Sequence, residues 1–490
     1  MEFKILSRKA TQGFLLSLVL CTVMVTTGCS VNPATGKNQL MLISEAQEIA
    51  MGREADPQII ASMGLYDDPE IQEYVSSLGR DLAAKSERPN LEWHFRVVDD
   101  PLVNAFALPG GYIYITRGIL AHFSSEAELA SVLGHEIGHV VARHSANQMS
   151  KQQLASVGLA VGTVLLDPRN QGYGALANAG MQLAFLKFSR DDERQADDLG
   201  LRYIDRVGYD PRPMTEVFET LGRVSAAAGA PRGPGWTATH PAPENRVARL
   251  GQKISAMNVD FTGRPVRRDE YFSRLAGMTY GSNPREGFFK DNVFYHPDLA
   301  LQLTFPQGWT TQNARSAVAA ISPNKDAIMV MTLAQQDTVD EAERAFFEES
   351  KVTRGNRWRP ALRGLQATGS YFQTGTEPQR VLGRAAFISQ GDRVFRLLTY
   401  SSEGKWRGYD RGLAGAVESF QRLTDRRYLD VQPAQLEVVR LQESMSLADF
   451  SRRYPSSSDL QTLAILNHVE EGEVLEAGRM VKYVVGGKIP

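Results

Sequence analysis

The stretch Gly134-His135-Glu136-Ile137-Gly138-His139 combines two imidazoles and one carboxylate at helical spacing. In a helix, residues four apart lie one turn above each other, so the rings of His135 and His139 can reach one metal ion. Glu136 then lies beside that ion, where a bound water would be. The spacing H-E-x-x-H on a helix is the arrangement of two zinc ligands and a general base.

The residues around this motif predict a buried helix. Ser125, followed three residues later by Glu128, has the spacing of a capping box and predicts where the helix begins. The apolar residues that flank the motif are Leu129, Val132, Leu133, Val140 and Val141. A chance match on a surface helix is the alternative, but burial of Glu136 costs free energy unless a charge holds it. The context therefore favours a metal site.

A catalytic zinc takes three protein ligands and keeps its fourth position for water. The segment Phe188–Gly200 predicts a helix that presents Glu193 and Asp197 four residues apart on one face. We expect Glu193 to bind the metal and Asp197 to accept the N–H of a ligating histidine. Asp192 or Asp197 is the alternative ligand, and a solvated, charged helix face is the alternative to any site.

The two motifs together, His135-Glu136-x-x-His139 followed by Glu193-x-x-x-Asp197, resemble the gluzincin pattern. Their flanking residues resemble metallopeptidase family 48, which includes the type I CAAX prenyl endopeptidases, and within it the soluble periplasmic branch. Further segments match in the expected order: Asn32-Pro33-Ala34-Thr35-Gly36, Ser44-Glu45-Ala46-Gln47-Glu48, Asn104 to Gly111, Arg143-His144, and His240-Pro241 with Arg246. The resemblance covers residues 30–255.

This resemblance implies an α+β chain that begins with a mainly helical zincin domain containing a small antiparallel sheet. It implies one Zn²⁺ per chain, held by His135, His139 and Glu193. Zinc would lower the pKa of its bound water, and Glu136 would pass the proton of that water to the leaving amine of a peptide. The soluble branch implies hydrolysis of misfolded or misassembled envelope proteins, which is a quality-control function.

Three basic residues near the motifs leave alternatives open. His240 is expected to have a catalytic role on the oxyanion, or to occupy the open metal position in a latent form; a structural loop histidine is the alternative. Arg246 is expected to bind the substrate or to anchor that loop, and an ordinary surface arginine is the alternative. His144 is out of step with His139, so we expect its ring to point away from the metal and, with Arg143, to complement the helix dipole.

A small sheet is predicted beside the metal helix. Trp93 to Val98 and Tyr112 to Thr116 alternate like strands, and Asn104 to Ala107 lies between them. One strand edge is expected to be open, because extended substrates pair with such edges through main-chain hydrogen bonds. The residues expected to bind substrate are Asn104, Ala105 and Phe106. The alternative is a turn cap followed by a core aromatic residue. Gly110-Gly111 predicts a tight hairpin.

The N-terminus predicts a lipoprotein-type signal peptide at residues 1–29. Its charged part contains Lys4, Arg8 and Lys9. An apolar run from Phe14 to Val25 follows, and Cys29 after Gly28 resembles a lipoprotein processing site, so we expect lipidation of Cys29. Thr26 stands where such signals usually have leucine, and a plainly secreted form is the alternative. Ser30 favours the outer membrane of a Gram-negative bacterium, with the protein in the periplasm.

Cysteine use and charge limit the possible partners. Cys21 and Cys29 are the two cysteines of the chain, so the mature protein has no internal disulfide. A formal net charge of −2 gives no sign of nucleic-acid binding. Leu154 to Leu166 is too short to span a bilayer. The Gly-rich segment that contains it, Leu154 to Phe188, is expected to be a lid over the cleft or plain core packing.

The length of 490 residues predicts about three domains. We expect a zinc peptidase domain at residues 30–255, a linker at 256–289 with a short helix, an α/β sandwich-like domain of unknown role at 290–425, and a small module at 433–490. In the α/β domain the predicted strands are Leu299 to Pro306 and Val394 to Tyr400, and the predicted helices are Asp340 to Lys351 and Arg411 to Leu423.

Residues 433–490 resemble a LysM module with its β-α-α-β plan. Glu443-Ser444-Met445 replaces the usual Gly-Asp-Thr opening, so contact with peptidoglycan and its absence are both open. The rival to an enzyme is a periplasmic chaperone or cell-wall-binding lipoprotein with a latent zinc site. Glu136 argues against this rival, because a purely structural zinc needs no base.

Overall fold

The computed structural model describes residues 29–159, 183–227, 235–241, 245–350, 352–377 and 379–490. The predicted signal segment before Cys29 and most of the apolar segment after Leu159 lie outside these residues. The signal peptide, the lipidation of Cys29 and the choice between lid and core therefore stay predictions. Within the described residues, every helix is too short or too polar to cross a bilayer.

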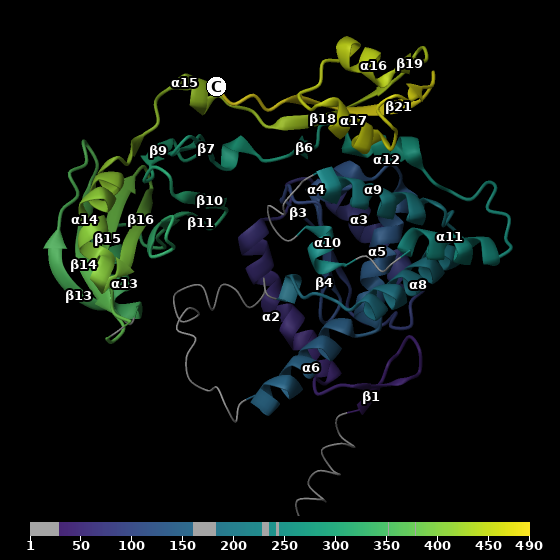
Figure 1. The fold of residues 1–490 in the computed structure, drawn as a ribbon, viewed down its shortest axis with the longest axis horizontal. Coiled ribbons are helices and arrows are strands. Elements are labelled where there is room, and N and C mark those ends of the chain that lie inside the picture. Colours follow the sequence, from purple (N-terminus) through teal and green to yellow (C-terminus); the bar gives the residue numbers. More distant parts are fainter. Residues whose placement is uncertain (1–28, 160–182, 228–234, 242–244, 351, 378) are drawn as a thin grey trace, which may run out of the picture.

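The N-terminal part consists mainly of helices around a three-stranded sheet (Figure 1). Its elements are β1 (Cys29–Val31), β2 (Asn38–Leu40), α2 (Glu45–Met63), α3 (Pro69–Ala83), β3 (His94–Val98), β4 (Ala105–Leu108), β5 (Tyr112–Thr116), α4 (Arg117–His122), α5 (Glu126–Val141), α6 (His144–Leu159), α8 (Arg190–Val207), α9 (Pro213–Ala227), α10 (Trp236–Thr239), α11 (Arg246–Ala256) and α12 (Arg268–Leu275). Helix α5 carries the H-E-x-x-H motif, and all of its residues are buried.

The predicted start of α5 is confirmed, but the predicted capping box is only half right. The side chain of Ser125 accepts a hydrogen bond from the backbone N–H of Glu128 at 3.2 Å, as an N-cap should. The carboxylate of Glu128 accepts the N–H of Ser124 at 2.8 Å rather than that of Ser125. Glu128 therefore ties the helix to the turn before it.

Helix α8 approaches α5 closely because small residues face each other. A Cβ atom added to Gly138 would lie 3.0 Å from the carbonyl oxygen of Ala196, and one added to Gly200 would lie 2.9 Å from the backbone nitrogen of His135. Real Cβ atoms rarely come this close to backbone. The small residues thus allow two helices far apart in sequence to bring their polar side chains to one place.

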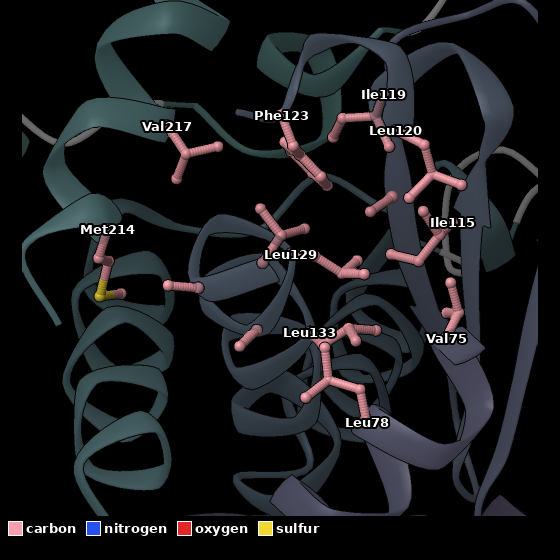
Figure 2. Close-up of a cluster of buried hydrophobic side chains, with 14 of the residues drawn as sticks. Val75, Leu78, Ile115, Ile119, Leu120, Phe123, Leu129, Leu133, Met214 and Val217 are labelled. Carbon is pink, nitrogen blue, oxygen red and sulfur yellow. The ribbon is translucent and has the colours of Figure 1, made fainter. Parts of the chain in front are cut away.

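The main hydrophobic core surrounds α5 (Figure 2). It is made by α3, β5, α4, α5 and α9, and its labelled residues are Val75, Leu78, Ile115, Ile119, Leu120, Phe123, Leu129, Leu133, Met214 and Val217. Each fully buried aliphatic or aromatic side chain contributes about 1.5–3 kcal/mol of transfer free energy. This packing fixes the helix on which the motif lies.

The small sheet is mixed, so the predicted antiparallel sheet is wrong in part. Its order is β3-β5-β4, with β3 parallel and β4 antiparallel to β5. After β4 the chain turns back as β5, which lies between the two other strands, antiparallel to β4 and parallel to β3. The predicted hairpin between β4 and β5 is present, and Gly110 and Gly111 adopt φ of 81° and 99° there.

The N-terminal motif folds back on the end of α5. Strands β1 and β2 pair antiparallel. The side-chain amides of Asn32 and Gln39 donate to the carbonyl of Ala142 at 3.4 and 3.2 Å. Arg143 follows with φ of 60° and donates to Glu48 and to the carbonyl of Ile43. The two amides thus bond the carbonyl of Ala142, the C-cap of α5, which has no partner inside the helix.

The second part is an α/β domain, shown in green in Figure 1. Its elements, with the segments that lead into it and out of it, are β6 (Thr279–Tyr280), η2 (Pro284–Glu286), β7 (Phe288–Lys290), β8 (Val293–His296), β9 (Leu301–Thr304), β10 (Thr310–Ala314), β11 (Ala317–Ile321), β12 (Ala327–Leu333), α13 (Val339–Glu349), β13 (Thr353–Trp358), β14 (Ala367–Thr374), β15 (Val381–Gln390), β16 (Arg393–Ser402), α14 (Glu403–Glu418), β17 (Gln421–Arg422) and α15 (Arg426–Leu429). A seven-stranded sheet in the order β10-β11-β12-β16-β15-β14-β13 forms its centre.

Helices α13 and α14 pack against different buried clusters of this sheet. Phe346 of α13 lies with Phe372 and Phe387 in one cluster, whereas Trp406 and Leu413 of α14 belong to another. The predicted helix from Arg411 to Leu423 is displaced in the structure, because α14 begins at Glu403 and ends at Glu418. The residues after it turn back as β17 to pair with β9.

The C-terminal module, residues 433–490, is shown in yellow in Figure 1. Its elements are β18 (Ala434–Arg440), β19 (Met445–Ser446), α16 (Leu447–Arg453), α17 (Leu460–Asn467), β20 (Val474–Leu475) and β21 (Met480–Gly486). The longer elements follow the β-α-α-β order expected for a LysM-like plan. β18 pairs with β21 and with β6. The segment expected as a linker contains α12, whose Tyr271 and Phe272 are fully buried in the main core.

Candidate metal centre

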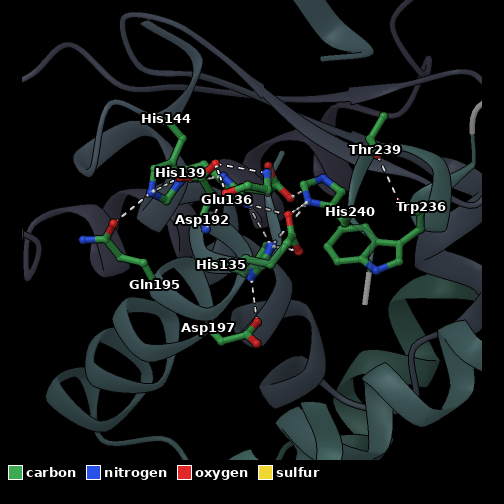
Figure 3. A network of polar contacts seen from close by, with 12 residues as sticks. His135, Glu136, His139, His144, Asp192, Gln195, Asp197, Trp236, Thr239 and His240 are labelled. Atoms are coloured by element: carbon green, nitrogen blue, oxygen red, sulfur yellow. Dashed lines mark hydrogen bonds and ion pairs between the residues drawn. The ribbon is translucent and has the colours of Figure 1, made fainter. Parts of the chain in front are cut away.

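Four predicted residues bring their ligand atoms together in the interior. His135 and His139 come from α5, Glu193 comes from α8, and His240 directly follows α10 (Figure 3). Their potential ligand atoms all lie within 4.8 Å of one another. Each residue is at most 1% exposed. One ion at the centre of the cluster would be within reach of all four side chains.

The distances show a convergent set of nitrogen and oxygen atoms. The Nε2 atoms of His135 and His139 lie 3.0 Å apart. Oε1 of Glu193 lies 3.4 Å from Nε2 of His139, and its Oε2 lies 3.5 Å from Nε2 of His135. Nδ1 of His240 lies 3.0 Å from Oε1 of Glu193 and 3.4 Å from Nε2 of His135.

The chemistry of this donor set fits Zn²⁺. Three imidazole nitrogens and one carboxylate oxygen are ligands that zinc prefers in four-coordinate sites. Oε2 of Glu193, both carboxylate oxygens of Glu136 and Nε2 of His240 are buried and have no hydrogen-bond partner among the described residues. Buried polar atoms without partners are costly, and a cation bound by Oε2 of Glu193 would offset part of that cost.

Burial would raise the pKa of Glu193, but His240 and hydrogen bonds from His135 and His139 outweigh it. These neighbours hold the pKa of Glu193 well below its ordinary value. Burial, together with the neighbouring His135 and His144, lowers the pKa of His139 well below its ordinary value against the effect of Glu193. A carboxylate that is ionised beside an imidazole that is neutral is the protonation state that metal binding requires.

Asp197 fixes the orientation of His135. Its Oδ1 lies 3.0 Å from Nδ1 of His135, so this nitrogen carries the proton and Nε2 is left as the ligand atom. Burial works against the imidazolium of His135, but Asp197 and Glu193 raise its pKa to about 9. Asp197 also accepts hydrogen bonds from Arg246 and Arg249, and Arg246 holds the pKa of Asp197 below its ordinary value against the effect of burial.

His144 does the same for His139: its ring lies outside the set of ligand atoms, but its contact with His139 is not predicted by the spacing. Nδ1 of His144 lies 2.9 Å from Nδ1 of His139, and Nε2 of His144 lies 3.0 Å from the side-chain oxygen of Gln195. Helical spacing fails here because Arg143 adopts φ of 60°, which ends one helix and starts α6 at His144. No signal in the local spacing identifies His144 or Gln195 as partners of a ligand.

Glu136 lies beside the cluster and is completely buried. Burial raises the pKa of its carboxyl group, and His240 and His135 oppose this rise. Oε1 of Glu136 lies 3.4 Å from Nε2 of His240. A carboxylate with raised proton affinity and no hydrogen-bond partner is suited to accept a proton from a water in the site.

His240 is held against the cluster by its own segment. The indole of Trp236 stacks on its ring, with centroids 4.2 Å apart and planes at 23°. The backbone N–H of His240 donates to the carbonyl of Trp236 at 2.8 Å, and that of Trp236 donates to the carbonyl of Val103 at 3.0 Å. The segment that brings His240 to the cluster is therefore bonded to the residue just before Asn104.

The residues expected to bind substrate lie at the edge of the sheet. β4 is an outer strand, because it pairs with β5 on one side alone in the described sheet. Asn104 immediately precedes it, and its backbone N–H bonds to Thr116. Ala105 is fully buried, and Phe106 is 2% exposed and stacks on Tyr114 at 4.9 Å. The side chain of Phe106 is therefore part of a core, and Asn104, just before the strand, contacts Thr239 of α10.

Arg246 is buried within the centre, so the alternative of an ordinary surface arginine is wrong. It is 5% exposed, and its guanidinium lies 3.6 Å from the ring centroid of Phe218. It donates to Asp197, and its Nη1 lies 3.6 Å from Oε2 of Glu193. As placed, Arg246 balances the charge of the two carboxylates.

Asp197→Asn is expected to weaken zinc binding by roughly 10–100-fold, the usual effect of losing a partner behind a metal ligand. The amide keeps the size of the side chain but removes the negative charge that Nδ1–H of His135 meets. Competition with a chromogenic zinc chelator measures the change. Asp205→Asn is the matched control, because Asp205 lies on the same helix and pairs with Arg264 outside the cluster. Equal zinc affinity in Asp197→Asn and wild type would contradict this role.

Known proteins share the part of the chain that contains this centre. Residues 69–254 match the model of Peptidase family M48. The chain is 32% identical over 288 residues to the Beta-barrel assembly-enhancing protease of Yersinia pestis, which covers 55% of this chain and 58% of that protein. The identity is 33% over 233 residues to the protein of the same name from Escherichia coli (strain K12), with coverages of 46% and 47%.

A more distant organism supplies a third relative. The chain is 37% identical over 188 residues to the Mitochondrial metalloendopeptidase OMA1 of Arabidopsis thaliana, which covers 38% of this chain and 36% of that protein. The chain spans about half the length of the two bacterial relatives that it matches. The family match at residues 69–254 contains the cluster and ends before the C-terminal module.

Proposed function

We propose that this protein is a zinc-dependent endopeptidase of the bacterial cell envelope, because residues 69–254 match the model of Peptidase family M48, in agreement with the resemblance predicted from the sequence. Its proposed substrates are misfolded or misassembled envelope proteins. The observation that carries the proposal is the buried convergence of His135, His139 and Glu193, with Glu136 beside them and without a hydrogen-bond partner. The enzyme class agrees with the named relatives, which are proteases or metalloendopeptidases.

The place of action is proposed from the N-terminal sequence and from the names of the relatives. Two bacterial relatives are named for β-barrel assembly, which favours envelope proteins as substrates. The predicted signal peptide favours the periplasm, and Cys29 would attach the mature chain to the outer membrane by a lipid anchor. Peptidoglycan contact through the C-terminal module has no support beyond its resemblance to LysM.

Several residues of the chain have separate roles in peptide hydrolysis. Zn²⁺, when bound, would polarise the scissile carbonyl and lower the pKa of a water. Glu136 accepts the proton of that water and delivers it to the leaving amine. Asp197 and His144 hold His135 and His139 in the tautomers that leave Nε2 free, and Arg246 balances the charge of Glu193.

The strand β4 would align an extended substrate beside the centre. An edge strand offers main-chain hydrogen bonds, which give affinity with little dependence on sequence. This suits a protease of unfolded chains. A pocket of about 490 Å³ lined by Phe218, Leu221 and Trp236 lies next to His240 and is proposed to receive an apolar side chain of the substrate.

One observation favours a second candidate function. His240 places Nδ1 where a fourth ligand would lie, and structural zinc sites are closed by four protein ligands. On this basis the protein would hold unfolded envelope proteins as a chaperone, with a latent metal site. Glu136 has no task in a purely structural site, so the peptidase is the better supported function.

Removal of the metal is expected to abolish cleavage of an unfolded outer-membrane β-barrel protein. Zinc returned in a one-to-one ratio should restore it, because the cluster has room for one ion. Gel analysis of the substrate with time measures cleavage, and the same barrel protein in its folded form is the control. Binding of the unfolded barrel without cleavage, in both wild type and His240→Ala, would decide for the chaperone.

A further inference from the structure

The C-terminal module reaches the peptidase domain at the turn that begins the metal helix. This turn consists of Ala121 and His122, which end α4, and Phe123, which leads on toward α5. The carbonyls at the end of a helix have no partner inside that helix. Here all three consecutive carbonyls accept hydrogen bonds from two side chains of the module, residues 433–490.

Lys482 and His468 make these three bonds. Nζ of Lys482, on β21, lies 2.8 Å from the carbonyl oxygen of Ala121 and 2.7 Å from that of Phe123. Nε2 of His468, which follows α17, lies 2.8 Å from the carbonyl oxygen of His122. A nitrogen that bonds a carbonyl must carry the proton, so His468 donates through Nε2. Lys482 is 0% exposed, which is rare for a lysine.

Glu128 links this turn to the metal helix itself. It lies in the first turn of α5, is 1% exposed, and accepts the N–H of Ser124. Its Oε1 lies 3.5 Å from Nδ1 of His468. Burial raises the pKa of Glu128 to about 8, and the ammonium of Lys482 acts against that rise. The module therefore meets the metal helix with a fully buried lysine and with a histidine whose side chain is 11% exposed.

The module is also joined to the peptidase domain by packing and by backbone. Leu436, Leu466 and Val484 belong to the same buried cluster as the apolar residues of α5. Ala434 of β18 pairs with Tyr280 of β6, which follows α12. Figure 1 shows α17 beside α12 and above α4. An interface that combines a shared hydrophobic core, strand pairing and buried hydrogen bonds is typical of one folded unit, whereas two tethered domains share a smaller and more polar interface.

We propose that the C-terminal module is a structural part of the peptidase, and that Lys482 and His468 are positioning residues that set the orientation of α5. His135 and His139 lie on the same rigid helix, so a displacement of its first turn also displaces these two metal ligands. The inference rests on the proposed zinc site. It assigns the module an internal partner, the turn between α4 and α5, in place of the cell wall.

Lys482→Met in the full-length chain tests the proposal. Methionine keeps much of the length and volume of lysine but leaves the carbonyls of Ala121 and Phe123 without a donor. Lys488→Met is the matched control, because Lys488 belongs to the same module and is exposed. His468→Leu removes the second donor, whereas His468→Gln keeps an N–H at the place of Nε2.

The readouts are zinc affinity, by chelator competition well below the unfolding temperature, and the visible absorption of Co²⁺ at the site, which depends on ligand geometry. We expect Lys482→Met and His468→Leu to lose zinc affinity by roughly 10-fold, as partners behind metal ligands do, and to change the Co²⁺ spectrum. Lys488→Met and His468→Gln should stay near wild type. If zinc affinity is retained in His468→Gln but lost in His468→Leu, the hydrogen bond of His468, and not the volume of its side chain, positions the helix.

The outcomes separate this inference from the proposed function. A wild type that binds no metal would overturn the zinc peptidase. Wild type and a folded Lys482→Met with equal zinc affinity and equal Co²⁺ spectra would overturn the positioning role alone. If Lys482→Met does not fold, His468→Leu decides, and an unchanged affinity and spectrum in that variant would overturn the proposal.

Discussion

Glu136→Gln is expected to bind zinc as wild type does and to lose peptidase activity by roughly 10²–10⁴-fold, the contribution of a positioned general base. Glutamine has the shape of glutamate but cannot accept a proton from water at neutral pH. The carboxylate of Glu136 is fully buried and has no hydrogen-bond partner among the described residues, so its replacement breaks no hydrogen bond among them. Burial raises its pKa, which strengthens it as a base.

The experiment needs zinc content and initial cleavage rates of the same preparations. An unfolded outer-membrane barrel protein is the substrate, and metal analysis of the dialysed enzyme gives the zinc per chain. Glu219→Gln is the matched control, because Glu219 is exposed on α9. Loss of zinc together with activity would make Glu136 a structural residue. Full activity in Glu136→Gln would refute the mechanism.

The parts of the site that local spacing governs could be predicted from the sequence. Two histidines four apart and a cap at Ser125 place the metal helix, since both depend on helical geometry alone. Glu193 and Asp197 follow the same spacing on α8, and the structure brings them to His135 and His139. The close crossing of the two helices depends on glycines. Their role could not be predicted from the sequence, because it requires knowing that the two helices are neighbours.

The parts that the sequence could not supply depend on backbone breaks and long-range contacts. His144 reaches His139 because Arg143 leaves the helical region, and spacing rules assume that it does not. The parallel pairing of β3 with β5 depends on the order of strands in space. The contact of Lys482 with Ala121 joins residues 361 positions apart, and an isolated lysine in a strand carries no sign of such a partner.

His240→Ala is expected to raise peptidase activity, by about 10-fold if the open form of wild type is populated at about one tenth. Nδ1 of His240 lies 3.0 Å from Glu193 and 3.4 Å from Nε2 of His135, which is the place of a fourth ligand (Figure 3). A substrate carbonyl oxygen and a water would have to occupy that coordination position. Alanine would vacate it, and it would also loosen the stacking on Trp236 that holds the segment closed.

The sign of the change separates the two roles considered for His240. A group that stabilises the oxyanion contributes in the transition state, so its removal should lower kcat by about 10²–10³-fold. A group that closes the site acts against substrate, so its removal should raise kcat/KM and weaken zinc binding at the same time. Thr237→Ala is the matched control, because Thr237 is exposed on the same short helix. A large fall in kcat with unchanged zinc affinity would mean that His240 is catalytic. The ring that closes the site would then also be needed for the reaction. In that case Trp236 and His240 would have to move together to open the site.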